Sequence, residues 1–168
     1  NAHPHSSNDG KITIVHNGII ENSESLLTKV VKLGYTINSE TDTEVIVHLL
    51  DHEIKTQADG RDYLDAFTQV ISQLQGSWAI AAMIHGMEGI LVSRQGAPMV
   101  IGRGEGNLSV SSDVQPFYGA CSEVAYMCDG DNFLLTKDGI VSKKDLDVPE
   151  FQPLTGVYDE QDPGIYGH

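Results

Sequence analysis

The sequence predicts an α+β fold in which helices lie on antiparallel β-sheet. Apolar residues recur at helical spacing between residues 26 and 74, and from residue 77 onward the apolar period changes to two. The strand-like runs of this second part are short and are separated by Gly, Pro, Asp and Ser, a pattern typical of antiparallel hairpins. A chain of 168 residues has the size of one domain, or of part of one.

Helical periodicity predicts three helices, at residues 22–34, 41–55 and 63–74. Gly34 and Gly76 suit the ends of the first and third helices, because glycine readily adopts the conformation that terminates a helix. Thr41 and Glu44 stand three residues apart at the start of the second helix. This spacing predicts a reciprocal capping box.

Strands are predicted on either side of these helices. A β-branched run predicts one at about residues 11–16, and residues 35–38 predict a short one. The later strands are expected to form an antiparallel meander at residues 77–84, 89–94, 98–102, 107–112, 123–128 and 132–136. Residues 136–139 carry a hairpin-turn signal. Residues 147–168 hold three prolines and no sustained period, so we expect a tail that crosses a surface or leads to another domain.

Composition and charge exclude several classes of function. The formal net charge of −14, from 24 acidic and 10 basic residues, argues against nucleic acid as a partner, because binding to phosphates requires a basic face. No apolar run reaches the length of about 18 residues that a membrane span needs, and the first ten residues lack the features of a signal peptide. We therefore expect a soluble, cytoplasmic protein that does not associate with membranes. No cofactor is expected.

Motifs for metal binding and for a serine nucleophile are weak. His3 and His5 form a His-x-His pair. His48 and His52 stand four apart on a predicted helix, where we expect a half-exposed edge. Zinc requires three or four ligands, so no metal site is predicted. No Gly-x-Ser-x-Gly motif occurs, and the glycine-rich residues 102–106 are expected to form a turn between strands.

The polar pair Asn17 and Gly18 follows the first predicted strand and admits two interpretations. Asn-Gly is a strong signal for a hairpin turn. Alternatively, the Asn side-chain amide and the Gly main-chain N–H donate to one point at a strand end, and two such donors stabilise a tetrahedral oxyanion. Asp42 is similarly open, since a carboxylate at a helix start serves the helix dipole or binds a ligand.

Four motifs carry a family resemblance: NAHPH at 1–5, VHNGIIEN at 15–22, SETDTEV at 39–45 and GAPMVIG at 96–102. In this order they resemble the glutaminase domain of the glucosamine-6-phosphate synthases, the isomerising glutamine–fructose-6-phosphate aminotransferases. The resemblance runs through essentially the whole chain and ends at residues 162–168, which are similar to the segment that leads into the sugar-isomerase half of that family. Other class II glutamine amidotransferases share the Asn-Gly pair but not HNGIIEN together with ETDTEV.

The resemblance implies an N-terminal-nucleophile hydrolase fold, an αββα sandwich of antiparallel sheets. In this family an N-terminal cysteine, with its own α-amine as base, attacks the side-chain amide of L-glutamine, and the ammonia released converts fructose 6-phosphate to glucosamine 6-phosphate. The motifs imply an oxyanion hole formed by Asn17 and Gly18, and they imply that Asp42 accepts the α-ammonium of glutamine. They suggest no chemical role for His3 or His16.

The sequence also departs from the family pattern. It begins at Asn1, so the N-terminal cysteine, the N-terminal strands and an upstream Arg-Trp-Ala-Thr-His segment are missing from it. Cys121 and Cys128 lie within or beside predicted strands, where we expect small core residues. We expect residues 1–146 to form a partial type 2 amidotransferase domain and residues 147–168 to lead towards sugar-isomerase domains. Unpaired sheet edges favour self-association, so we expect a homo-oligomer.

Two other functions stay open at this point. One is a class II amidotransferase with a different ammonia acceptor, and the other is a non-catalytic module that binds its ligand through Asp42. Sequence after His168 distinguishes the first alternative, because sugar-isomerase repeats are needed for the fructose 6-phosphate reaction. Sequence before Asn1 distinguishes the second, because a Met-Cys start restores the nucleophile.

We predict that the chain by itself does not hydrolyse glutamine, because its sequence contains only half of the family's site. The test is incubation of the purified chain with L-glutamine and an assay for glutamate. Turnover well above a buffer blank contradicts this prediction.

Overall fold

The structure is a computed structural model that describes residues 3–39, 41–57, 62–143 and 147–155. The predicted loop residues 58–60 and tail residues 156–168 lie outside the described residues. The elements in chain order are β1 (His5–Ser6), β2 (Ile12–Ile20), α1 (Ser23–Lys32), α2 (Asp42–Thr56), α3 (Tyr63–Ile71), β3 (Gly76–Ile84), β4 (Ile90–Gln95), β5 (Val100–Arg103), β6 (Leu108–Ser111), the 3₁₀ turn η1 (Gln115–Phe117), β7 (Glu123–Tyr126), β8 (Asn132–Thr136), β9 (Gly139–Ser142) and β10 (Gln152–Pro153).

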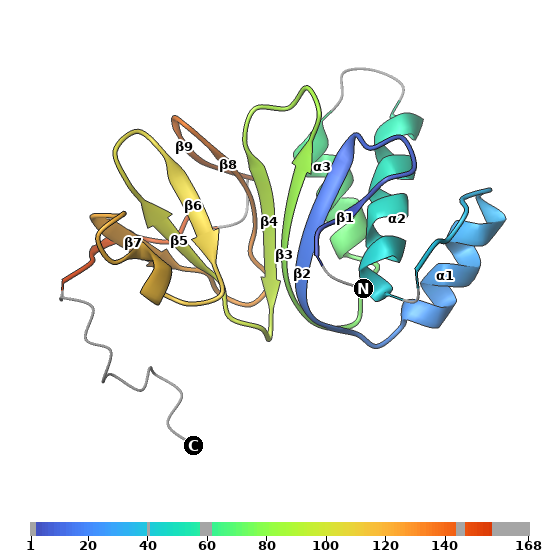
Figure 1. The fold of residues 1–168 in the computed structure, drawn as a ribbon, viewed down its shortest axis with the longest axis horizontal. Helices are drawn as coiled ribbons and strands as arrows, with labels where there is room; N and C mark the ends of the chain where they lie inside the picture. Colours follow the sequence, from blue (N-terminus) through green and yellow to red (C-terminus); the bar gives the residue numbers. More distant parts are fainter. Residues whose placement is uncertain (1–2, 40, 58–61, 144–146, 156–168) are drawn as a thin grey trace.

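The strands form two antiparallel sheets, which confirms the predicted α+β class. One sheet has the order β1-β2-β3-β4-β8-β9 and the other has the order β10-β7-β5-β6. The helices lie on one side of the six-stranded sheet and the four-stranded sheet lies on its other side (Figure 1). In the described part of the chain, η1 and its loops cover the outer face of the four-stranded sheet, where Phe117 packs on Val100 and Val124.

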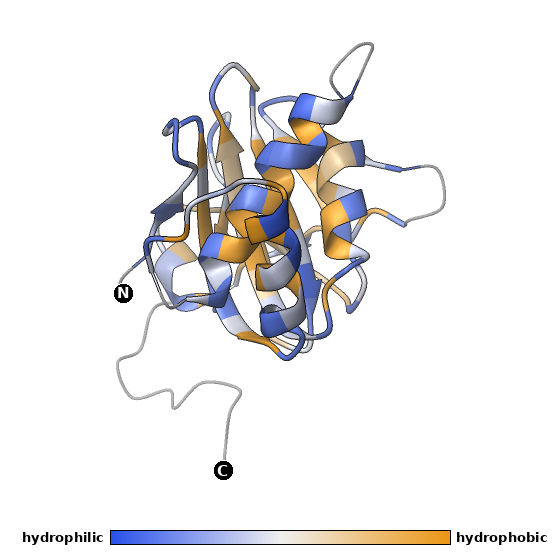
Figure 2. Cartoon of the chain, turned by 90° about the vertical axis from the view of Figure 1, so that its right-hand side faces the viewer, coloured by the Kyte–Doolittle hydropathy of each residue, from blue (hydrophilic) through white to orange (hydrophobic). Residues whose placement is uncertain are grey.

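Alternation along β3 explains why the six-stranded sheet is buried on both faces. Ile80 and Ala82 belong to the core beneath the helices, whereas Ala79 and Ala81 belong to the core between the sheets. Successive side chains of a strand point to opposite faces, so one strand serves both cores. Figure 2 looks onto the helix layer and shows hydrophobic and hydrophilic stretches alternating along the helices. No helix in the described ranges combines the length and apolarity needed to cross a bilayer.

The strands are paired differently from the predicted meander. β4 pairs with β8 instead of β5, because β5, β6 and β7 leave the first sheet and form the second. The predicted hairpin at residues 136–139 joins β8 to β9 and is confirmed. Gly76 starts β3, so it does not end the third helix. Within the segment predicted as a tail, β10 pairs with β7.

The predicted short strand at residues 35–38 is wrong, because side chains hold this segment in place of a strand ladder. The Tyr35 ring packs on the His48 ring with centroids 5.0 Å apart, and its hydroxyl donates to Asp51 at 2.8 Å. Burial, together with this contact to Asp51, raises the pKa of the Tyr35 phenol. His48 is 0% exposed, so the half-exposed edge expected at this histidine is also wrong. α2 packs against α1, α3, β1 and β2, which leaves it little free surface.

The capping box predicted at the start of α2 does not form. The Glu44 side chain instead binds the main chain of the segment before the helix, and we call this contact the Glu44 clamp. Thr41 is the N-cap residue but makes no capping hydrogen bond with its side chain. The Glu44 carboxylate instead accepts hydrogen bonds from the main-chain N–H groups of Asn38 at 2.8 Å and Ser39 at 2.6 Å. Burial opposes ionisation of Glu44, but the hydrogen bonds from Ser39 and Asn38 outweigh it and lower its pKa. The clamp therefore fixes the segment that leads into α2.

We predict that Glu44→Gln lowers the free energy of unfolding by about 1–3 kcal/mol, because an amide cannot accept from both main-chain donors in place of the carboxylate. The measurement is urea unfolding at neutral pH. Because the folded pKa of Glu44 lies below its ordinary value of 4.5, its stabilisation is complete above that pH and is lost as the pH falls through the folded value. The unfolding free energy of Glu44→Gln should therefore fall less on acidification than that of the unsubstituted protein.

Glu53→Gln is the matched control, since Glu53 lies on the same helix and its carboxylate has no partner among the described residues. Its unfolding free energy should change by less than about 0.5 kcal/mol. Equal effects of the two substitutions contradict the clamp.

Candidate functional site

β2 runs without interruption through Asn17 and Gly18. It pairs with β3 from Ile12, opposite Ile84, to Ile20, opposite Gly76. The hairpin interpretation of the Asn-Gly pair is therefore wrong, and so is the expected end of the strand at about residue 16. The inward-facing apolar residues at 12, 14 and 20 explain this, because they continue one alternation on both sides of the pair.

The main-chain N–H of Gly18 points to the edge of β2 that faces away from β3. In an antiparallel ladder, alternate residues direct their N–H groups to opposite edges. Glu21 donates to the Gln75 carbonyl, on the β3 side, whereas Ile20 donates away from β3 to Asp42. Gly18 lies two residues before Ile20, so its N–H points to the same edge as that of Ile20. At this edge β1 pairs only with residues 13 and 14 of β2, so no described strand covers Gly18.

Position 18 requires glycine for two geometric reasons. The residue has φ = +124°, a conformation that side-chain-bearing residues rarely adopt. A Cβ at this position would lie 2.1 Å from the main-chain oxygen of Ser77 in β3. The glycine therefore lets the two strands approach closely at the site.

Asn17 presents a free side chain beside this N–H. The residue is exposed, and its amide has no hydrogen-bond partner among the described residues. Alternation places it on the face opposite the buried His16. Its two amide donors are thus available to a ligand at the edge of β2.

Asp42 is the first residue of α2, and both of its carboxylate oxygens face β2. Oδ2 accepts a hydrogen bond from the Ile20 N–H at 2.9 Å. Oδ1 lies 3.6 Å from Nδ1 of His16. The side chain keeps 25% exposure, so its charge is accessible to a ligand. His16 and Ile20 each lie two residues from Gly18, which places the carboxylate beside that glycine.

His16 also belongs to this site, although the motifs around it suggest no chemical role. Its side chain is 2% exposed, and Nδ1 lies 3.1 Å from the Thr43 hydroxyl. Burial lowers the pKa of His16, and the negative charge of Asp42 partly opposes this shift. The signal that marks His16 is a polar residue in register with the inward Ile12 and Ile14.

The two cysteines lie on or beside the four-stranded sheet. Cys121 packs against the apolar cluster on the outer face of that sheet, and burial raises the pKa of its thiol. Cys121 is partly buried, and a neutral thiol is a poor nucleophile. Cys128 follows β7 and is exposed, so the core position expected for it is wrong. Its N–H donates to the Asp131 carboxylate at 2.7 Å.

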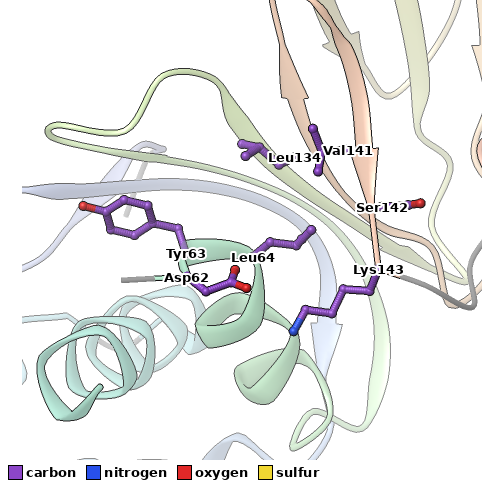
Figure 3. Close-up of a pocket in the computed structure, with 7 residues that line it drawn as sticks. All are labelled: Asp62, Tyr63, Leu64, Leu134, Val141, Ser142 and Lys143. Carbon is purple, nitrogen blue, oxygen red and sulfur yellow. The ribbon is translucent and has the colours of Figure 1, made fainter. Parts of the chain in front are cut away.

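A pocket of about 410 Å³ lies elsewhere, between the start of α3 and the strands β8 and β9 (Figure 3). Its apolar wall includes Leu64, Leu134 and Val141. The charged groups there are already engaged, because Asp62 caps α3 and Lys143 pairs with Asp65. The pocket therefore presents no reactive arrangement comparable to that around Asp42. The described residues also contain no group of three or more potential metal ligands.

Comparison with known families identifies the family of this chain. Residues 1–130 match the family described as glutamine amidotransferase domain. The chain belongs to this family. Within this amidotransferase domain, β2 carries Asn17 and Gly18, and α2 begins with Asp42.

Curated relatives of this amidotransferase domain are named glutamine–fructose-6-phosphate aminotransferase [isomerizing]. The one from Xanthomonas campestris is 43% identical over 141 residues, which are 83% of the chain and 22% of the relative. The one from Thermococcus kodakarensis is 39% identical over 145 residues, which are 86% of the chain and 24% of the relative. The chain thus spans about a quarter of the length of these relatives.

Solved structures of amidotransferases share the fold. Glutamine phosphoribosylpyrophosphate amidotransferase from B. subtilis has a TM-score of 0.66 at 21% identity, over 84% of the chain and 30% of that protein. A predicted glutamine amidotransferase from Pseudomonas aeruginosa has a TM-score of 0.55 at 12% identity, over 85% of the chain and 65% of that protein. The predicted N-terminal-nucleophile hydrolase fold is confirmed.

We predict that Gly18→Ala lowers the free energy of unfolding by about 3 kcal/mol or more, since it adds a main-chain overlap to the strain of a positive φ. Gly139→Ala is the control, because Gly139 has φ = +137° and open space around its Cβ position. This control isolates the conformational strain, of about 1–3 kcal/mol. Urea unfolding measures both, and similar losses at the two positions argue against a close approach of β2 and β3.

Proposed function

We propose that this amidotransferase domain binds L-glutamine and contributes to its hydrolysis in an isomerising glutamine–fructose-6-phosphate aminotransferase. The observation that carries this proposal is the position of the Asp42 carboxylate, which is held on β2 beside the uncovered N–H of Gly18. A site for an amino acid amide needs an anion for the ammonium group and donors for the carbonyl oxygen. Asp42, Gly18 and Asn17 supply these groups.

Asp42 selects amino acids through charge. Its carboxylate is partly exposed and already accepts one hydrogen bond from Ile20, which leaves acceptor positions for the α-ammonium of glutamine. A hydrogen bond between two charged groups is about twice as strong as one between neutral groups. A simple amide without the ammonium group leaves this carboxylate unpaired and binds less well.

Asn17 and Gly18 act on the carbonyl oxygen of the side-chain amide. When a nucleophile attacks that carbonyl, negative charge develops on the oxygen, and donors held in place stabilise this charge more than they stabilise the substrate. The Gly18 N–H is fixed by the strand, so it needs no reorganisation during the reaction. The Asn17 amide is the second donor, and its freedom from other partners supports this role.

The whole-protein activity extends beyond this domain. The shared name of the relatives favours fructose 6-phosphate as acceptor of the ammonia over the acceptors of other class II amidotransferases. The acceptor reaction then takes place on a sugar-isomerase partner domain, and the N-terminal cysteine of the family supplies the nucleophile. The expected self-association and the cytoplasmic location stay predictions.

We predict that Asp42→Asn raises KM for L-glutamine by about 10- to 100-fold, because it removes a charge-assisted contact worth about 1.5–3 kcal/mol. The measurement is glutamate release by the full-length protein. Asp138→Asn is the control, because Asp138 lies in the β8–β9 hairpin and its carboxylate has no described partner. An unchanged KM in Asp42→Asn removes Asp42 from substrate binding.

We predict that Asn17→Ala lowers kcat by about 10²- to 10³-fold, with a smaller change in KM, because an oxyanion donor acts in the transition state. The same glutamate assay measures both constants. Asn8→Ala, an exposed asparagine in the turn before β2, is the matched control and should leave kcat unchanged. A fall in kcat of less than about tenfold in Asn17→Ala contradicts the oxyanion role.

A further inference from the structure

His16 is a buried polar residue for which the proposed chemistry has no use. The residue is buried and lies on the helix-facing side of β2, in register with Ile12 and Ile14. An apolar side chain fills such a position without leaving polar atoms to satisfy. Nε2 of His16 has no hydrogen-bond partner among the described residues. A buried polar atom without a partner is unfavourable and needs an explanation.

The other ring nitrogen, Nδ1, faces two polar residues of α2. Nδ1 lies 3.1 Å from the Thr43 hydroxyl and 3.6 Å from Oδ1 of Asp42. The Thr43 hydroxyl can donate or accept, whereas the nearby carboxylate is only an acceptor, so we assign the proton of the neutral ring to Nδ1, on the side that faces this negative charge. In this tautomer His16 presents an N–H towards Asp42 and Thr43, which are the first two residues of α2.

The Asp42 carboxylate makes one hydrogen bond to β2, and its other oxygen lies against the His16 ring at 3.6 Å without a hydrogen bond. The Ile20 N–H binds Oδ2 and leaves Oδ1 to be oriented by a second group. His16 faces Oδ1 from the other side of Gly18. The ring packs against Oδ1 and so restricts a rotation of the carboxylate that the single hydrogen bond to Ile20 leaves open. A ligand that binds a fixed carboxylate loses less free energy to ordering it.

The protonation state of His16 suits this task. Burial lowers its pKa, so the ring is neutral at neutral pH. A cationic imidazolium beside Asp42 would compete with an ammonium ligand for the same carboxylate. A neutral imidazole orients the carboxylate and leaves its charge available.

We propose that His16 is a positioning residue that fixes the Asp42 carboxylate for the α-ammonium of the substrate. This inference rests on the proposed function, in which Asp42 binds that ammonium. His16 itself does not touch the substrate in this account. Its effect is confined to ligands that carry the ammonium group, which distinguishes it from a general role in packing.

The first test compares three substitutions in the full-length protein. In His16→Asn, the side-chain amide nitrogen stands near the place of Nδ1. In His16→Gln it stands near the place of Nε2, and His16→Leu has no donor. We expect KM for L-glutamine to rise about tenfold in the Leu and Gln variants and less than about threefold in the Asn variant, with kcat changed less than KM. Equal KM values for the Asn and Gln variants overturn the proposal.

The second test uses two competitive inhibitors, L-glutamate and glutarate, which share a carbon skeleton and differ in the ammonium group. We expect His16→Leu to weaken inhibition by L-glutamate about tenfold and to leave inhibition by glutarate within about twofold. Equal weakening of both inhibitors shows a general structural role and overturns the proposal. Should His16→Leu fail to fold in a thermal-unfolding control, the Asn and Gln variants decide the same comparison.

Asp42→Asn separates this inference from the proposed function. When Asp42→Asn leaves the ratio of the two inhibition constants unchanged, the proposed role of Asp42 fails. When Asp42→Asn changes that ratio and His16→Leu does not, only the role of His16 fails. In the double variant, His16→Leu should add less than about twofold to the effect of Asp42→Asn on L-glutamate, because its action passes through that carboxylate.

Discussion

The site depends on one hydrogen bond, from the Ile20 N–H to the Asp42 carboxylate. It joins the edge of β2 to the first turn of α2, two elements separated by α1 and its connecting segments. Without it, the carboxylate would be an ordinary helix-start residue that serves the helix dipole. With it, the charge lies beside Gly18, whose N–H is directed to the same edge. The proposed oxyanion donors and the proposed ammonium acceptor thus share one reference point, the β2 strand.

The rest of the fold holds that reference point in place. α2 is buried by neighbours on nearly every side, and Glu44 clamps the preceding residues Asn38 and Ser39 to its first turn. On the other side of the contact, β3 pairs with the full length of β2. A strand with a buried face cannot slip by one residue without reversing its inward and outward side chains. Both partners of the hydrogen bond are therefore rigid.

Local patterns in the sequence predict where helices and strands lie better than they predict which strands pair with each other. The helices and most strands were predictable because their apolar periods are set within a few residues. The pairing of β4 with β8, in contrast, depends on which strands join the second sheet, and no local period encodes that choice. The Asn17-Gly18 pair shows the same limit, since a strong turn signal is overridden by pairing with β3. The roles of Asn17, Gly18 and Asp42 came from the family resemblance, whereas spacing alone left two interpretations of each.

The contacts of His16 could not be predicted from the sequence. Its register with Ile12 and Ile14 marks it as an inward residue, but the register does not say what it meets there. The answer lies in α2, whose first residue brings a carboxylate within 3.6 Å of the ring. A carboxylate at a helix start is stabilised by the dipole, and the same dipole opposes the approach of a cationic ligand. Recognition of an ammonium group at this helix start therefore requires a carboxylate turned towards β2, and the contacts to Ile20 and His16 provide that orientation.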